Sequence, residues 1–305
     1  MNMIPRFAGG RPMMTGREPL TDDQLRAIAP SVFAEQAHES RSERYFYIPT
    51  IEVLRGLRAE GFEVFSAQQG RSRVPGKADF TKHILRLRKP GGALEVGGSV
   101  HEIVLLNSHD GTSSYRIMDG VFRFICTNGM VSGCIDHDVR VPHTGDQQDK
   151  VIEGVYTVLD RAEQTMAAAQ DWRGIRLDDE QINQFGRAAR AIRYPELADL
   201  SRSEADARIR PADIVLPRRP DDTARDLWMM FNRAQENLIR GGFDVRTPVS
   251  DEEAMNSRQR RFRHHGTLGR VRVRSAGAVN GIDDNTKINR NLWTLAQAQA
   301  ALLAA

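Results

Sequence analysis

The sequence predicts an α+β protein in which an antiparallel sheet precedes a mostly helical part. Between about residues 61 and 126, short β-branched and aromatic runs alternate apolar and polar side chains, and turn dipeptides such as Asp110-Gly111 separate them. From about residue 148 the apolar residues recur with a period of about 3.6, the spacing of one helix face. Strands followed by helices, without regular interleaving, are typical of α+β folds.

The first sixty residues contain the weaker signals. Residues 1–20 mix Gly, Pro, Arg and Met without periodicity, so we expect a flexible arm. Thr21 is a suitable N-cap for a short helix. Thr50 is the expected N-cap of a second helix over 50–60, and Gly61 stands where a helix C-terminus favours positive φ.

The middle of the chain predicts four or five strands joined as an antiparallel meander. Leu85 and Leu87 alternate with Arg86 and Arg88, which predicts a half-buried strand with a cationic outer face. The expected strands are 61–69, 82–88, 101–107, 113–119 and 121–126.

Helical periodicity dominates the rest of the chain. A long amphipathic helix over 148–169 should pack on the sheet, and further helices are expected over 178–193, 221–240 and the C-terminal end. The predicted organisation is a flexible arm (1–20), a β-rich domain (21–146), a helical part packed on the sheet (147–240), a basic loop or linker (241–282) and a C-terminal helix (283–305).

Positive charge is concentrated in two stretches of the sequence. Basic residues outnumber acidic ones by only 43 to 40. Residues 71–89 nevertheless hold seven basic residues against one acidic residue, and residues 256–275 hold seven basic residues and no acidic one. The remainder of the chain is net negative, and such basic islands attract polyanions, most often nucleic acid.

The first island suggests contact with single-stranded DNA. If Leu85 and Leu87 face the core, Arg86 and Arg88 lie about 6.6–7 Å apart on the outer face, close to the roughly 6–7 Å phosphate spacing of an extended strand. Changing both to Ser should then weaken DNA binding without affecting stability. The upstream run RSERYFYIP adds cations and aromatic rings, as single-strand binders do. The expected nucleic-acid-binding residues are Arg41, Arg44, Tyr45, Tyr47, Arg71, Arg73, Lys77, Lys82, Arg86, Arg88, Arg258, Arg260, Arg261 and Arg263.

Each island also has an alternative interpretation. The first is equally consistent with a solvated edge strand whose charges oppose aggregation, together with three core aromatic residues. The second is either a disordered tether that raises non-specific affinity or an exposed loop whose arginines pair with acidic helices.

Other functional classes find less support in the sequence. Cys126, Cys134, His137 and His143 lack the close cysteine pair of structural zinc sites, so we expect no bound metal. Phosphate-binding, dinucleotide-binding, serine-hydrolase and zinc-protease motifs are missing, so we expect no cofactor and disfavour an ATP-driven motor. The sequence contains neither an apolar run of about 18 residues nor a signal-peptide pattern, so we expect a cytoplasmic protein without a membrane partner.

Several runs resemble a known family. RYFYIPT, GFEVFSAQQGRSR, FTKHILRLR and EIVLLNSHDGTSSYRIMDGVFRFICTNGMV resemble the phage/plasmid-like family of uncharacterised proteins, a domain of unknown function common on prophages, plasmids and integrative elements. The resemblance covers about residues 25–240, and NSHDGTSSYR and CTNG are its most distinctive parts. It implies a mobile-element origin and a DNA-linked role, with no established reaction. The order of helix, strands and long helix is also similar in architecture to Rad-type single-strand annealing proteins, which form rings and bind single strands in a basic groove.

Three hypotheses follow from the sequence. The favoured one is a single-stranded DNA binder of a mobile element that anneals strands without ATP and forms homo-oligomers, for which the C-terminal helix is a plausible docking element. The second is a regulatory or anti-restriction protein that acts on a host enzyme, to which the acidic remainder of the chain points. The third is a nuclease that uses carboxylates such as Asp110, Asp119 or Asp136.

Overall fold

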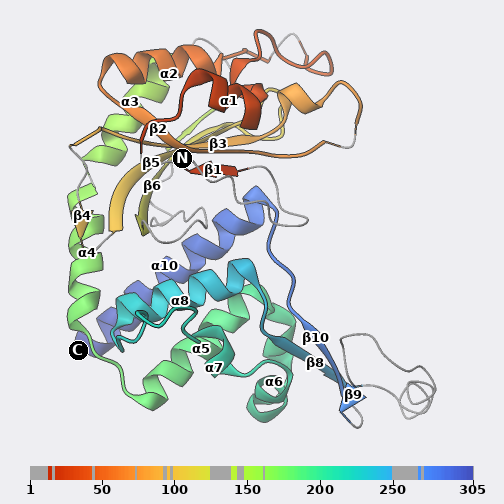
Figure 1. Cartoon of the computed structure of the whole chain (residues 1–305), viewed down its shortest axis with the longest axis vertical. Helices are drawn as coiled ribbons and strands as arrows, with labels where there is room; N and C mark the ends of the chain where they lie inside the picture. Colours follow the sequence, from red (N-terminus) through yellow and green to blue (C-terminus); the bar gives the residue numbers. More distant parts are fainter. Residues whose placement is uncertain are drawn as a thin grey trace. The chain divides into compact units, whose positions relative to one another are not determined.

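The fold is α+β, as the sequence predicts, with an antiparallel sheet in the N-terminal half and helices in the C-terminal half (Figure 1). The chain divides into two compact units: Met1–Ala169 with Asn280–Thr286, and Gln170–Val279 with Lys287–Ala305. This division differs from the predicted organisation, in which one helical part over 147–240 packs on the sheet. The computed structural model describes residues 13–15, 18–42, 45–72, 74–91, 95–96, 99–123, 139–142, 148–160, 162–248, 267–268 and 271–304.

The first unit is built on one antiparallel sheet of spatial order β1-β2-β3-β5-β6-β7, and β4 pairs with β5. β6 is one continuous strand where the sequence predicts two. β1 lies inside the predicted flexible arm and pairs with β2, Met13 opposite Gln68. The strands are β1 (Met13–Thr15), β2 (Glu63–Gln69), β3 (His83–Arg88), β4 (Glu95–Val96), β5 (Ser99–Asn107), β6 (Tyr115–Arg123) and β7 (Val139–Val141).

Helices of the first unit bury their apolar stripes against this sheet. Leu54 of one helix, Val155 of another and Leu85 of β3 are all fully buried in one hydrophobic core. Thr21 caps the first helix, as predicted, in a capping box with Gln24. The helical elements are α1 (Asp22–Ile28), η1 (Pro30–Phe33), α2 (Thr50–Ala59), η2 (Ala78–Phe80) and α3 (Gln148–Leu159).

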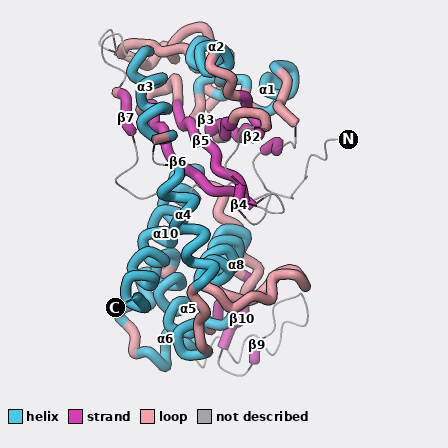
Figure 2. Tube along the Cα trace, turned by 90° about the vertical axis from the view of Figure 1, so that its left-hand side faces the viewer, coloured by secondary structure: helices cyan, strands magenta, loops and turns pink. Residues whose placement is uncertain are grey.

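The second unit has an aromatic centre. Trp172, Trp228, Phe231 and Trp293 pack together, with 4.5 Å between the ring centroids of Trp172 and Trp293. Figure 2 shows the helices that carry them side by side. The sequence predicts one helix over 148–169, but the structure has two helices there: α3 ends at Leu159, and the next helix begins at Ala162. The remaining helical elements are α4 (Ala162–Gly174), α5 (Asp179–Arg193), η4 (Pro195–Asp199), α6 (Arg202–Arg208), α7 (Pro211–Ile214), α8 (Leu227–Arg240) and α10 (Ile282–Ala304).

The segment 241–282, predicted as a basic loop or linker, contains paired strands instead. β8 (Asp244–Pro248) pairs along its whole length with β10 (Val271–Ser275), and β9 (Thr267–Leu268) pairs with β10 on the other side. This β8–β10 ribbon extends from the helices of the second unit (Figure 1). Alternation of Val and Arg in β10 is the strand pattern that the loop prediction overlooked.

None of the described helices combines the length and apolar character needed to cross a bilayer.

Candidate nucleic-acid interface

β3 does not present a cationic face to solvent, so that prediction is wrong. Arg86 Nε lies 2.5 Å from Glu102 Oε2, and Arg88 Nη1 lies 3.0 Å from Oε1 of the same carboxylate. The side chains of Arg86 and Arg88 are only 8% and 10% exposed. β3 lies inside the sheet, between β2 and β5, and Glu102 comes from β5. Both arginines of this strand are therefore largely buried and share one carboxylate within the first unit.

The tyrosines expected to stack on bases support a loop instead. The Tyr45 hydroxyl donates to the backbone oxygen of Ser108 at 3.1 Å, and the Tyr47 hydroxyl donates to that of Ala34. Burial raises the pKa of both phenols. The Tyr47 ring also meets the ring of His109 edge-on, with 4.9 Å between centroids. Both tyrosines thus help to position the loop between β5 and β6.

The remaining predicted contacts divide into three groups. Arg41 covers the turn of that loop, because a Cβ added at Gly111 would lie 2.2 Å from its Nη1. Arg71, Lys77 and Lys82 line one cavity, considered below. The residues that lie outside the described ranges are Arg44, Arg73, Arg258, Arg260, Arg261 and Arg263, together with Cys126, Cys134, His137 and His143.

Thr50 is the centre of a buried polar network that the sequence did not reveal. Thr50 is the first residue of α2. The sequence predicts it as the N-cap of this helix, but the N-cap is Pro49. The Thr50 hydroxyl accepts from Asn107 Nδ2 at 3.0 Å and from the Tyr115 hydroxyl at 2.9 Å. His83 Nε2 and His109 Nε2 lie 2.9 and 3.2 Å away. The NSHDGTSSYR motif therefore joins α2 and β3 through one side chain.

His83 is a neutral member of this network. Ser31 donates its hydroxyl proton to Gln69 Oε1 at 2.7 Å, so the hydroxyl oxygen accepts from His83 Nδ1 at 2.8 Å. Nδ1 also lies 3.4 Å from the carbonyl oxygen of Thr81, which can only accept. The proton of the imidazole is therefore on Nδ1, and Nε2 accepts from Thr50. Complete burial lowers the pKa of His83 to about 4, although the hydrogen bond to Thr81 acts in the opposite direction.

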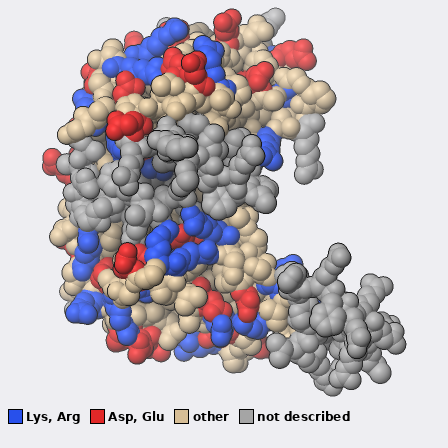
Figure 3. Space-filling view, viewed as in Figure 1, with Lys and Arg blue, Asp and Glu red and all other residues tan. Residues whose placement is uncertain are grey.

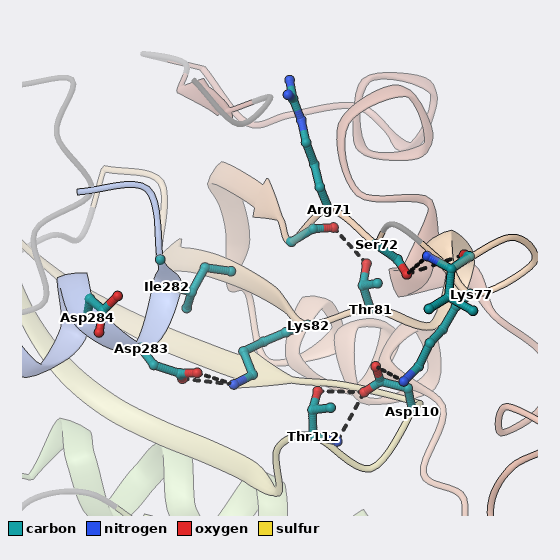
Figure 4. Close-up of a pocket in the computed structure, with 13 residues that line it drawn as sticks. Arg71, Ser72, Lys77, Thr81, Lys82, Asp110, Thr112, Ile282, Asp283 and Asp284 are labelled. Atoms are coloured by element: carbon teal, nitrogen blue, oxygen red, sulfur yellow. Dashed lines mark hydrogen bonds and ion pairs between the residues drawn. The ribbon is translucent and has the colours of Figure 1, made fainter. Parts of the chain in front are cut away.

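A cavity of about 440 Å³ lies beside the β5–β6 loop in the first unit (Figure 4). Its wall comes from Asp110 and Thr112, from residues 281–284, and from part of the β2–β3 connection, namely Gly70, Arg71, Ser72, Val74, Lys77, Thr81 and Lys82. The Thr81 hydroxyl donates to the Gly70 carbonyl oxygen at 2.8 Å and holds the two ends of the 70–82 loop together. A hydrogen bond between a hydroxyl group and a backbone carbonyl therefore holds this part of the cavity wall in place.

Asp110 is fixed in the wall of this cavity. Its Oδ1 accepts from the backbone N–H and the hydroxyl of Thr112 at 3.0 and 2.6 Å, and its Oδ2 lies 3.3 Å from Lys77 Nζ. Burial by itself would raise the pKa of Asp110, but the two Thr112 hydrogen bonds and the charge of Lys77 outweigh it and lower the pKa. Asp110 is therefore an ionised structural residue. The nuclease hypothesis named it with Asp119 and Asp136, whose side chains are outside the description.

Residues 37–293 match the model of one family, described as Domain of unknown function (DUF932). The chain belongs to this family. The UPF0380 protein YafZ of Escherichia coli K12 is 42% identical over 299 residues, covering 97% of both chains. The UPF0380 protein YfjQ of the same organism is 40% identical over 295 residues, covering 97% of this chain and 96% of the relative. No solved structure matches the chain.

In this DUF932 chain, two exposed arginines are not among the nucleic-acid-binding residues predicted from the sequence. Arg272 and Arg274 of β10 alternate with Val271 and Val273, so they share one face of the β8–β10 ribbon and lie about 6.6–6.8 Å apart along the strand. The sequence rule applied to Arg86 and Arg88 would have found them.

Charges on the described surface of this DUF932 chain are otherwise mixed. On the face drawn in Figure 3, basic and acidic side chains are intermingled over the described parts of both units. Within the described ranges, no three His, Cys, Asp or Glu side chains gather in a way that could hold a metal ion. A polyanion would therefore be recognised by local groups rather than by the overall charge.

Proposed function

We propose that this protein binds single-stranded DNA through the arginine face of the β8–β10 ribbon. The observation that carries the proposal is the pair Arg272 and Arg274, exposed on one face of a strand. Guanidinium groups bind phosphates in bidentate geometry, and their spacing is close to the roughly 6–7 Å between phosphates of an extended strand.

The position of the ribbon in the sequence supports the same proposal. Residues 249–266 connect β8 to β9, and this connection contains Arg258, Arg260, Arg261 and Arg263. This arginine-rich stretch is therefore covalently joined to β8 at one end and to β9, the other neighbour of β10, at the other end. A strand face with several guanidinium groups suits a backbone-directed, sequence-tolerant contact.

The biological setting we propose is a mobile element such as a phage or plasmid. The element order of the first unit, α2 followed by antiparallel strands and then α3, supports this proposal, because we expect the same order in Rad-type annealing proteins. We extend the proposal accordingly to ATP-independent strand annealing in the cytoplasm by a homo-oligomer, because several ribbons in a row would hold a longer strand than one ribbon can.

The decisive experiment is a titration of the full chain against labelled single- and double-stranded oligonucleotides across a salt series. We expect saturable binding that favours the single strand, needs no nucleotide and weakens steeply with salt, because bound phosphates release counterions. Equal or tighter binding of the duplex would refute the single-strand preference. A lack of binding at low salt would refute the proposal and leave a regulatory or anti-restriction interaction with a host protein as the leading function.

A further inference from the structure

The cavity beside the β5–β6 loop contains cations that the proposed DNA contact does not use. Arg71, Lys77 and Lys82 all line it and all come from the connection between β2 and β3. Every residue of the cavity belongs to the first unit, whereas the β8–β10 ribbon belongs to the second. An inference about the cavity is therefore independent of the proposed function.

The two lysines keep hydrogen-bond donors available for a ligand. An ammonium group has three N–H donors. Within the described part of the chain, Lys77 Nζ is paired with Asp110 Oδ2 at 3.3 Å, and Lys82 Nζ is paired with both oxygens of Asp283 at 2.6 and 2.8 Å. The Lys77 and Lys82 side chains are 25% and 15% exposed, so a ligand in the cavity would meet them partly shielded from water. Figure 4 shows both ammonium groups along one wall, with Arg71 extending away from them.

The carboxylates that pair with these lysines differ in how firmly they are held. The Asp110 side chain is 5% exposed and is also bonded twice to Thr112. The Asp283 side chain is 65% exposed, and Lys82 is its one partner among the described residues. An incoming anion can therefore replace Asp283 at Lys82, whereas Asp110 stays in place.

We propose that this cavity binds a phosphomonoester, whose phosphate takes the place of the Asp283 carboxylate at Lys82. A phosphate offers three acceptor oxygens to the donors of this ammonium. The cavity, at about 440 Å³, lies within the range of about 300–1,000 Å³ typical of small-molecule sites and is larger than a phosphate alone needs. The Lys77 ammonium and the Thr112 hydroxyl line the part of the wall that would contact the rest of the ligand. A free nucleotide or the terminal phosphate of a DNA strand would supply this chemistry.

Binding of inorganic phosphate to the full chain, measured by isothermal titration calorimetry, tests the site. We expect Lys82→Met to weaken binding about tenfold or more, because one charge-assisted contact is lost. We expect Asp283→Asn to tighten binding several-fold, because the competing carboxylate charge is removed. Lys89→Met is the matched control, since Lys89 is an exposed lysine that does not line the cavity, and it should bind as the wild type does.

Opposite effects of the Lys82 and Asp283 substitutions would support the site even if one variant were less stable. The absence of saturable phosphate binding to the wild type, or equal binding by wild type and both variants, would overturn it. Competition by thymidine 5′-monophosphate and by 5′-phosphorylated and 5′-hydroxyl oligonucleotides then identifies the source of the phosphate. A protein whose ribbon arginines are replaced should still bind phosphate, so failure of this inference and failure of the proposed function are separable.

Discussion

Arg86 and Glu102 form a buried ion pair between neighbouring strands of the sheet, with side chains only 8% and 1% exposed. Arg88 shares the same carboxylate. Such a pair is costly to break from one side, because the charge that remains has been removed from water.

We therefore expect Arg86→Ser combined with Arg88→Ser to lower the free energy of unfolding by about 3 kcal/mol or more. This reverses the sequence-based expectation of unchanged stability. Urea unfolding followed by far-UV circular dichroism provides the measurement. Arg55→Ser is the control, because its pair with Glu52 is exposed and such pairs contribute at most about 1 kcal/mol. Equal stability of the double variant and the control would contradict the buried pair.

His83 should make the first unit sensitive to acid. Its pKa falls from 6.5 to about 4 on folding, so the unfolded chain binds the proton more tightly. The contribution of neutral His83 to the free energy of unfolding is fully present above pH 6.5. It is lost as the pH falls from 6.5 to 4, by about 3 kcal/mol in total. His83→Gln should flatten the unfolding free energy over this range, whereas His38→Gln, nearer the surface, should not. An unchanged pH profile in a folded His83 variant would refute the assignment.

Thr50 should contribute through its hydroxyl rather than its shape. Thr50→Val keeps the volume but removes one hydrogen bond each from Asn107, Tyr115 and His83, so we expect a loss of about 2–3 kcal/mol. Thr50→Ser keeps the hydroxyl and loses only a methyl group, about 1 kcal/mol. Chemical denaturation of the two variants in parallel makes the comparison. If Ser were as damaging as Val, helix geometry rather than the polar network would explain the residue.

Gly241 should be irreplaceable at the start of the β8–β10 ribbon. Its φ is +68°, and an added Cβ would lie 2.2 Å from the Ala276 backbone oxygen. We expect Gly241→Ala to destabilise the second unit by about 2 kcal/mol or more. All three tryptophans belong to this unit, so tryptophan fluorescence reports its unfolding selectively. Gly174→Ala, where the added methyl meets open space, should be nearly neutral.

The ribbon arginines should set part of the salt dependence of DNA binding. Removing two phosphate contacts with Arg272→Gln and Arg274→Gln should reduce the slope of log affinity against log salt by about 1.4. Arg173→Gln with Arg202→Gln removes the same charge from exposed positions on α4 and α6 and should leave the slope unchanged. Identical slopes for the two double variants would place the contact elsewhere.

Local patterns in the sequence predict the helices and strands better than they predict the tertiary contacts of these elements. The helix over 50–60, the strand over 82–88 and the fold class are confirmed, because periodicity, caps and turn dipeptides act over a few residues. The burial of Arg86 could not be predicted, because the alternation of apolar and polar residues shows which side chains share a face of a strand but not which strands pair with it. Glu102, sixteen residues away, is what makes that face compatible with burial.

The candidate site could be predicted only in part, for the same reason. Lys77 and Lys82 stand out as basic residues, but Asp283, the exposed partner of Lys82, lies about two hundred positions later in the chain. The sequence predicts only that Thr50 caps a helix. Its role in the polar network could not be predicted, because the four side chains around its hydroxyl come from distant strands and loops. Contacts of this range depend on topology, which no short window contains.

The helix α10 begins within the stretch Asn280–Thr286, which completes the first unit although all of Gln170–Val279 precedes it in the chain. During synthesis the first unit therefore leaves the ribosome without Asn280–Thr286, and Lys82 lacks its partner Asp283 until all of Gln170–Val279 has been translated. Domains usually mature in the order in which they are made. Here the sheet can form early, but the cavity is complete only after residues 281–284, which follow all of Gln170–Val279, have been translated, so a chain terminated before them would lack that part of its wall.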